Sequence, residues 1–346
     1  MPSQDDQSQK KKPVAETLLG SHLCVVSPSC FTEACFSVPA VRALKHFTPE
    51  RSISVLCPKS QMPLWRHGLD EVDHLIDYED RASAKKIASL VEGCTEKFDS
   101  TILWEASNAA KACKIVGIDQ CVGYANEELM PLLTNAIACD SSAGPIEHRV
   151  RHYLGLVNQL GAEAFVPSSF EKPPLPPAPE QIVIAIAPFS EYGSSYQWPA
   201  ERFVKVVEVM QNRYPQIGWT LYGHSLGANK KSVGFFKDLL EQENFNQSDT
   251  TDSEVFTALA KSTALLACDG EVAHMAAHVG LPAAVIFGPN APEWKRPMGK
   301  QSVVIREHVA CSPCFKPKCP IDLRCHNEVS ADAVVQALES VIDQRH

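Results

Sequence analysis

The chain has 346 residues, enough for two domains of ordinary size, and its 45% hydrophobic content is typical of a globular protein. Its 41 acidic residues outnumber the 32 lysines and arginines, and the formal charge of −9 argues against a nucleic-acid-binding surface. No run approaches the ~20 apolar residues that cross a bilayer. Residues 1–17 are polar and lack the apolar core of an export signal, so we expect a disordered tail and a cytoplasmic protein.

The first half of the chain alternates between short apolar runs and segments with helical spacing. The predicted strands are 22–27, 53–57, 72–76, 100–104 and 120–124, and the predicted helices between them are 64–68, 82–91, 109–116 and 146–160. A further helix is expected to begin near Val38 after a loop, because Pro39 is typical of a first helical turn. This alternation predicts a doubly wound α/β domain over residues 18–170.

A proline-rich segment then divides the chain. Residues 171–181 contain five prolines, a composition that forms an extended, semi-rigid linker. After it the predicted strands are 182–187, 219–222, 264–268 and 283–287, and the predicted helices are 200–213, 233–241, 254–260 and 331–342. We expect a second α/β domain over residues 182–346, ending in a closing helix, with a ligand cleft between the domains.

The segment 264–289 predicts a strand, a turn at Asp269 and Gly270, a helix over 271–279 and a second strand. Gly280 suits the left-handed position after the helix, and Pro282 prevents its continuation. Such a βαβ unit aims the start of its helix at the carboxyl edge of a parallel sheet, where free backbone N–H groups can bind a phosphate. The alternative is an ordinary packing unit without a ligand.

Four features occur in the order and spacing of one known family. They are residues 38–44, residues 191–193 with 198–203, residues 269–274 with 287–289, and a run of cysteines near the C-terminus. Together they resemble glycosyltransferase family 9, the ADP-heptose:lipopolysaccharide heptosyltransferases. The resemblance implies the GT-B fold, in which two Rossmann-like domains face each other across a cleft. The N-terminal domain would bind the acceptor and the C-terminal domain the nucleotide-sugar donor.

The resemblance also implies transfer of a heptose-like sugar by inverting direct displacement, with no cofactor required. The general base would be Glu33, because Thr32 and Glu33 stand where the family has a Gly-Asp pair, six residues before Pro39. Glu33 moves the carboxylate outward by one methylene, and a displacement of that order can cost a factor of ~100 in rate. The alternative for Glu33 is a solvated loop carboxylate.

Donor-binding roles implied by the resemblance fall on two loops and one helix start. The residues are Tyr196, Gln197, Asp269, Gly270, Glu271, His274 and Gly288. Tyr196 and Gln197 stand where members carry Lys and Arg; they can donate hydrogen bonds but supply no positive charge, and Tyr196 could instead only shield the domain edge. His274 is either a donor contact or a satisfied helix histidine.

Glu271 replaces a small residue and places a carboxylate in the first helical turn. It would repel a diphosphate there by roughly 4 kcal/mol, taking ~4 Å and an effective dielectric of 20. Lys295 and Arg296, which follow Gly288, could supply compensating charge, and the alternative for them is a solvated loop pair.

Four of the thirteen cysteines lie close together, at Cys311, Cys314, Cys319 and Cys325. Their spacing predicts a structural zinc site, for which His326 is a spare ligand. Two disulfides and four inert thiols remain as alternatives.

The expected partners are a nucleotide-sugar, most simply an ADP-sugar, and a glycan or lipid-linked acceptor such as lipopolysaccharide. Because the family's acceptors sit at the inner membrane, we expect peripheral association with its cytoplasmic face. Two other functions stay open: a catalytically silent protein that keeps the fold as a binding or scaffold module, and a regulatory subunit that interacts through its cysteine cluster.

Overall fold

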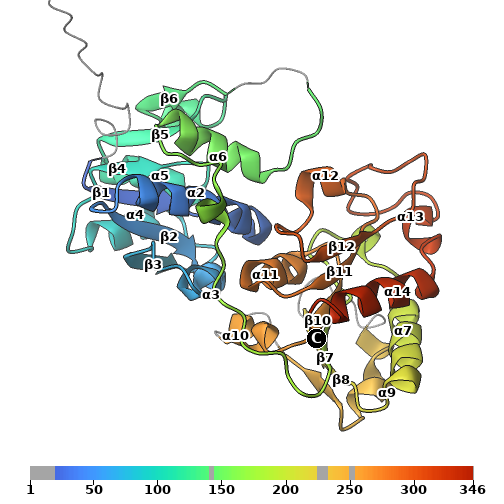
Figure 1. Ribbon diagram of the computed structural model, residues 1–346. Coiled ribbons are helices and arrows are strands. Elements are labelled where there is room, and N and C mark those ends of the chain that lie inside the picture. Colours follow the sequence, from blue (N-terminus) through green and yellow to red (C-terminus); the bar gives the residue numbers. More distant parts are fainter. Residues whose placement is uncertain (1–19, 140–143, 224–232, 249–253, 346) are drawn as a thin grey trace, which may run out of the picture.

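The structure is a computed structural model that describes residues 20–139, 144–223, 233–248 and 254–345. It has two lobes, each built on a parallel sheet and joined by a single linker (Figure 1). The predicted disordered tail at 1–17 lies outside the described residues. Within the described ranges, no helix combines the length and the apolar character needed to cross a bilayer.

The N-terminal sheet has six parallel strands in the order β3-β2-β1-β4-β5-β6. They are β1 (His22–Val26), β2 (Ser52–Pro58), β3 (His74–Tyr78), β4 (Ser100–Ile102), β5 (Gln120–Tyr124) and β6 (Asn135–Ile137). The α-helices of this lobe are α2 (Phe31–Phe47), α3 (Met62–Arg66), α4 (Ala84–Glu92), α5 (Asn108–Val116) and α6 (Val150–Gln159), and its 3-10 turns are η1 (Lys59–Gln61), η2 (Met130–Leu132) and η3 (Pro167–Phe170). This strand order is that of a doubly wound Rossmann-like domain.

The C-terminal sheet repeats this topology, with the order β12-β11-β10-β7-β8-β9. Its strands are β7 (Val183–Ala187), β8 (Gly218–Leu221), β9 (Phe245–Gln247), β10 (Ala264–Cys268), β11 (Ala283–Ile286) and β12 (Ser302–Ile305). Its helices are η4 (Ser194–Tyr196), α7 (Ala200–Arg213), α9 (Lys237–Leu240), α10 (Val255–Ala260), α11 (Glu271–Val279), α12 (Pro292–Lys295), α13 (Arg324–Asn327) and α14 (Ala331–Ile342). The predicted α/β architecture is therefore confirmed in both halves.

The central strands are short apolar runs because helices cover both faces of each sheet. Every residue of β10 is buried, and β10 pairs in parallel with β7 on one side and β11 on the other. The prediction for 264–289 is confirmed closely, since α11 spans the predicted residues and Gly280 has φ 82° at its C-terminus. The closing helix α14 also matches its prediction, begins at an N-cap from Ser330, and packs within the C-terminal lobe.

The predicted start of the first long helix is wrong. Helix α2 begins at Phe31, so Pro39 lies inside it and Glu33 is in its first turn. An interior proline costs roughly 3 kcal/mol. Burial offsets that cost, because Phe31, Phe36 and other apolar side chains of the early turns are inaccessible, and each large buried apolar side chain contributes about 1.5–3 kcal/mol. The proline rule failed here because α2 is held from several sides by tertiary packing.

Three edge strands, β6, β9 and β12, were not predicted. They have only three or four residues each, and Asn or Gln side chains interrupt the apolar pattern of β6 and β9. The strand predicted at 72–76 lies two residues later, as β3.

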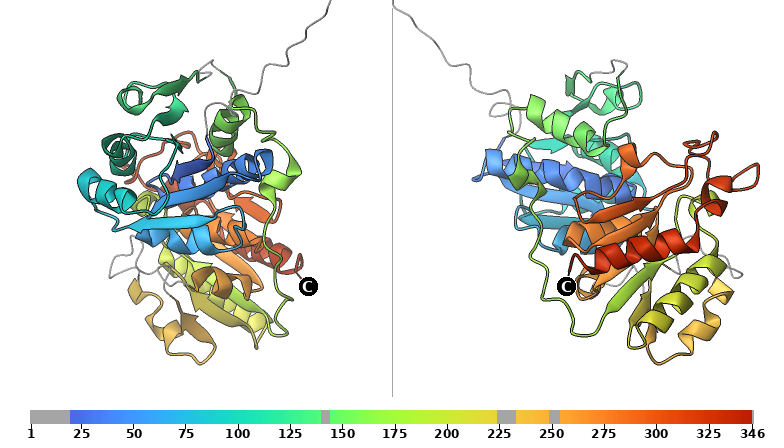
Figure 2. Two further views of the ribbon diagram at one scale, coloured as in Figure 1. Left: turned by 90° about the vertical axis from the view of Figure 1, so that its left-hand side faces the viewer. Right: turned by 45° about the vertical axis from the view of Figure 1, so that its right-hand side comes forward.

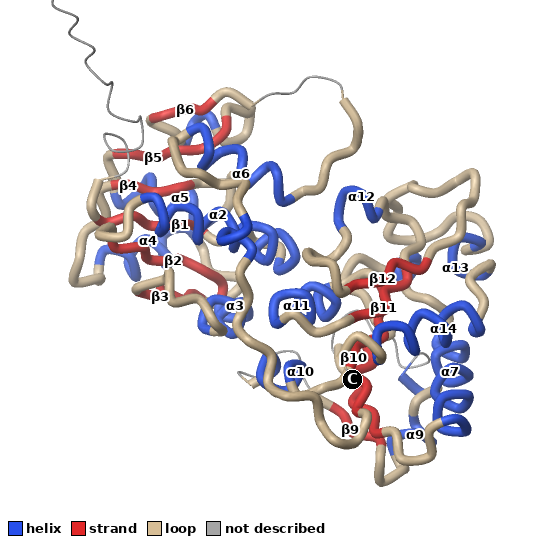
Figure 3. Tube along the Cα trace, in the orientation of Figure 1, coloured by secondary structure: helices blue, strands red, loops and turns tan. Residues whose placement is uncertain are grey.

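Residues 171–181 contain no helix or strand, as expected of a linker. The linker leaves the N-terminal lobe and passes along the molecule to β7 (Figure 2). Helices α2 and α11 pack against each other between the two sheets (Figure 3). The residues that begin these two helices are thereby brought to one region.

Candidate functional site

The candidate site lies where the strand order of each sheet reverses. In the N-terminal sheet this point is between β1 and β4, and the loop after β1 leads into α2. In the C-terminal sheet it is between β7 and β10, which lead into residues 188–193 and into α11. Ligands of open α/β sheets bind at such reversal points, beyond the carboxyl ends of the strands.

Glu33 is held by three side chains. Its Oε2 accepts hydrogen bonds from Arg149 Nε at 2.8 Å and from Tyr153 Oη at 2.6 Å. Its Oε1 pairs with Lys295 Nζ at 2.8 Å, and only 12% of the Glu33 side chain is exposed. Burial alone would raise the pKa of Glu33, but Arg149, Lys295 and Tyr153 together lower it to about 2. The interpretation of Glu33 as a solvated loop carboxylate is therefore wrong.

Lys295 comes from the other lobe, at the end of α12, so the Lys295–Glu33 pair joins the two domains. A second bridge runs beside it, where the Tyr192 hydroxyl donates to Thr32 Oγ1 at 2.5 Å. A third joins the backbone N–H of Arg149 to the carbonyl of Trp294 at 2.8 Å. Lys295 is only 15% exposed, so its interpretation as a solvated loop residue is wrong, whereas Arg296 is exposed.

Asp269 follows β10 and is buried, with 1% of its surface exposed. Its Oδ2 accepts a hydrogen bond from Asn290 Nδ2 at 2.7 Å, while Oδ1 has no partner among the described residues. Burial, together with the nearby Glu191 carboxylate, raises the pKa of Asp269 to about 7. Asp269 thus offers one unused buried oxygen at the start of α11.

The first backbone N–H of α11 already has a carboxyl partner. The amide of Glu271 donates to Glu191 Oε2 at 3.1 Å, and a Cβ at position 270 would lie 2.9 Å from that oxygen, so Gly270 allows the approach. Burial and the neighbouring Glu191 carboxylate raise the pKa of Glu271 to about 8, and burial also raises that of Glu191. These two carboxyls occupy the end of the helix at which the sequence predicted a phosphate site.

Tyr196 and Gln197 lie beside this helix start. The Tyr196 ring is buried, 5.3 Å from the ring of Tyr192, and burial raises its pKa to about 12. Gln197 Nε2 donates to the carbonyl of Ser190 at 3.3 Å. Both side chains thus border the loop that carries Glu191.

His274 and Gly288 pack inside the protein. The His274 ring is buried, meets Phe36 of α2 edge-on at 5.0 Å, and has an Nε2 without a partner among the described residues. Burial lowers the pKa of His274 to about 3, so it is neutral at pH 7. Gly288 allows the buried ring of His326 to lie directly against the backbone.

The four clustered cysteines are free thiols in the structure, without the disulfides considered as one alternative. Cys319 Sγ accepts backbone hydrogen bonds from Ile321 and Leu323, at 3.5 and 3.3 Å. Burial and the other three thiols raise the pKa of Cys325 to about 11. Within the described residues, however, no three His, Cys, Asp or Glu side chains are arranged to hold a metal ion. As they lie, these side chains do not fit a zinc site.

Sequence reasoning missed Arg149, Tyr153 and Glu191. Arg149 and Tyr153 reach Glu33 from more than a hundred positions away in the chain, and no local pattern indicates such a contact. Glu191 was noted only as part of a motif, and its place at the start of α11 depends on the pairing of β7 with β10.

The two Rossmann-like sheets, with polar side chains gathered at both points where the strand order reverses, have the GT-B fold of solved heptosyltransferases. A model of glycosyltransferase family 9 (heptosyltransferase) matches residues 145–324. This match covers more than half of the chain, and the chain belongs to that family.

The curated lipopolysaccharide heptosyltransferase 2 of Salmonella typhimurium is 23% identical over 318 residues, which are 82% of this chain and 87% of that protein. The solved ADP-heptose heptosyltransferase II of E. coli superposes with a TM-score of 0.73 at 19% identity, over 93% of this chain and 99% of that one. A second E. coli heptosyltransferase, solved with ADP, gives a TM-score of 0.69 at 15% identity, over 92% and 99%. These structures share the fold of this chain.

Proposed function

We propose that this protein transfers a sugar, heptose or a close relative, from an ADP-sugar to a lipopolysaccharide-type acceptor. The observation that carries the proposal is the placement of Glu33 at the reversal point of the N-terminal sheet, paired with Lys295 of the facing lobe, in a member of glycosyltransferase family 9. A structural relative solved with ADP supports this choice of nucleotide. The name of a curated relative, lipopolysaccharide heptosyltransferase 2, supports a lipopolysaccharide-type acceptor.

In the reaction, Glu33 acts as the general base. It takes the proton from the acceptor hydroxyl while that oxygen bonds to the anomeric carbon of the donor. The bond from that carbon to the diphosphate breaks with its electron pair, and the nucleoside diphosphate leaves, so the configuration inverts. A base works best when its pKa is near the operating pH, and the pKa of about 2 in the free protein makes Glu33 a weak base.

Lys295 connects donor binding to activation of this base. It is the cation paired with Glu33, and its charge also acts on Glu191 and Asp269 beside α11. A diphosphate bound at the start of α11 competes with Glu33 for this ammonium. When Lys295 turns to the diphosphate, Glu33 loses one of its two cationic partners and its pKa rises. The donor thus supplies the condition for proton abstraction, and Tyr153 and Arg149 keep Glu33 in position.

The acceptor is expected to bind beside Glu33 on the side of the N-terminal lobe. A cavity of about 330 Å³ opens there beside Arg149, with His152 and Arg151 in its wall. This volume is within the range of small-molecule sites. Arg149 therefore lies between the candidate base and the room available for an acceptor sugar.

Calorimetry with ADP-, UDP-, GDP- and CMP-sugars tests the proposal. We expect one donor, an ADP-sugar, to bind with a Kd in the micromolar range, about −8 kcal/mol. Absence of binding to all four, with and without magnesium, would contradict an enzymatic function.

That negative result would favour a second candidate, a catalytically silent protein that uses the fold for binding. The observation in its favour is the Glu191 carboxylate, which already takes the first N–H of α11. Gel filtration with candidate acceptor glycans would then be the direct test, because a silent binding module retains acceptor binding without donor binding.

Structural zinc at Cys311, Cys314, Cys319 and Cys325 remains a prediction, which the present side-chain arrangement does not support. Metal analysis after purification under reducing conditions tests it, and less than about a tenth of an equivalent of zinc rejects the site.

A further inference from the structure

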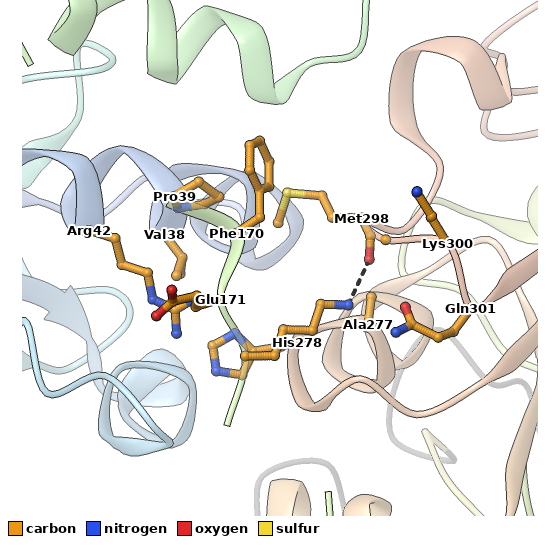
Figure 4. A pocket seen from close by; sticks show the side chains of 12 residues that line it. Val38, Pro39, Arg42, Phe170, Glu171, Ala277, His278, Met298, Lys300 and Gln301 are labelled. Carbon is orange, nitrogen blue, oxygen red and sulfur yellow. Dashed lines mark hydrogen bonds between the residues drawn. The ribbon is translucent and has the colours of Figure 1, made fainter. Parts of the chain in front are cut away.

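A second cavity lies between the domains, away from Glu33 and Asp269. It has a volume of about 370 Å³, and its walls come from α2, the start of the linker, α11 and the loop before β12 (Figure 4). Pro39 in its wall lies six residues after Glu33, and Ala277 lies six residues after Glu271. The two helices that begin at the candidate site therefore continue into this cavity.

Lys172 is a half-buried cation of this cavity, and no acidic side chain pairs with it among the described residues. Its ammonium donates to the carbonyl of Met298 at 3.2 Å, and within the described residues it forms no ion pair within 4.0 Å. Burial, and then the charge of Arg42, lower the pKa of Lys172 to about 8. Gly299 has φ +114° and faces the ammonium, where a Cβ would lie 2.6 Å from Nζ, so the backbone is shaped around this group. Partial desolvation of an ammonium without a counter-ion has a cost, and a bound anion would offset that cost.

Arg42, a second cation of the wall, is already neutralised. Arg42 Nε lies 3.4 Å from Glu71, and its NH2 group donates to the carbonyl of Gly68 at 3.1 Å. Glu171 and Lys300, one of each sign, are exposed at the rim, and His278 is neutral at pH 7, because burial lowers its pKa to about 3. Only the positive charge of Lys172 is therefore left without a counter-ion in this cavity, and one negative charge on a ligand would neutralise it.

The remaining walls are apolar. Val38 and Pro39 line one side, Ala277 another, and the side chains of Phe170 and Met298 face the space between them (Figure 4). Phe170 is 38% exposed, which leaves much of its ring without a protein partner. The matching ligand has a hydrocarbon part and a single acidic group.

We propose that this cavity binds an apolar monocarboxylate, with its carboxylate on Lys172 and its hydrocarbon part against Phe170 and Met298. This site goes beyond the proposed sugar transfer and does not rest on it. A ligand here contacts both α2 and α11, so its occupancy couples to the relative position of the two lobes.

Calorimetry of the full chain at pH 7 with octanoate, 1-octanol, octylamine and octyl phosphate tests the proposal. We expect octanoate to bind at least tenfold more tightly than each of the other three. Equal binding of octanoate and octanol would overturn the role of Lys172, and tighter binding of octyl phosphate would overturn the single-charge argument.

Two variants locate the site. Lys172→Met removes the ammonium, and Ala277→Leu fills part of the cavity. Each substitution should weaken the binding of octanoate at least tenfold. Lys114→Met, at an exposed lysine of α5 that is not part of this cavity, is the matched control and should change the affinity less than threefold. Unchanged binding in both Lys172→Met and Ala277→Leu would overturn the proposal. If Lys172→Met fails to fold by circular dichroism, Ala277→Leu and the ligand series still decide the outcome.

Discussion

Lys295 and Glu33 form an ion pair of 2.8 Å that joins the two domains at the candidate site. One partner is at the end of α12 in the C-terminal lobe, and the other is in the first turn of α2. Because both side chains are largely buried, water screens this pair less than an exposed surface pair. In the proposed mechanism, this pair keeps the Glu33 carboxylate a weak base until the donor binds.

Replacing Lys295 by methionine should weaken ADP binding at least tenfold, or about 1.4 kcal/mol, since the cation expected on the diphosphate is lost. Calorimetry measures this change. Arg296→Met is the matched control, because Arg296 is the next residue and is exposed. It should change the affinity less than threefold. Equal effects of the two substitutions would show that only the overall charge of the loop matters.

Glu33→Gln should keep ADP affinity within about threefold of the wild-type value, or strengthen it, because Lys295 is released. Turnover should fall by ~100-fold or more, the usual contribution of a general base. Single-turnover kinetics with the donor identified by calorimetry separate the two effects. Full activity in this variant would remove Glu33 from the chemical step.

Glu271→Gln should stabilise the protein at pH 8 and change it little at pH 4. The pKa of Glu271 is raised from 4.5 to about 8, by burial first and then by Glu191. At a pH between these two pKa values, the Glu271 carboxyl has lost its proton in the unfolded chain but keeps it in the folded protein. The stability of the fold therefore falls as the pH rises through this range. The glutamine side chain cannot ionise and should recover roughly 1–3 kcal/mol at pH 8. Thermal melts at both pH values measure the difference, and an equal shift at pH 4 and 8 would count against the carboxyl pair.

Gly288→Ala should destabilise the fold by roughly 1–3 kcal/mol, the usual cost of overpacking. A Cβ there would overlap the buried ring of His326. Gly234→Ala is the matched control, since a Cβ at that position meets nothing within 4 Å and should be neutral. Urea unfolding of both variants gives the comparison, and a stable Gly288→Ala protein would show that His326 can move aside.

The sequence predicted the α/β architecture because apolar strands and helices alternate with a clear period. It also predicted α11 and its glycine C-terminus, where the chemistry of the turn is local. The start of α2 was wrong because burial between the domains outweighs the local preference of Pro39. The resemblance placed Glu33 in the site. The pairing of Glu33 with Arg149 and Lys295 could not be predicted. Arg149 reaches Glu33 only when α6 packs on α2 within the N-terminal lobe, and Lys295 only when the C-terminal lobe faces it.

The exchange of Lys295 between Glu33 and the donor is tested most directly by measuring the pKa of Glu33. The measurement is an NMR pH titration that monitors the chemical shift of the Glu33 carboxyl carbon, with and without saturating ADP. In the free protein the pKa should lie near 2. With ADP bound it should rise by one unit or more, because the ammonium then faces the diphosphate. A protein that binds ADP while the pKa of Glu33 stays unchanged or falls would contradict the exchange.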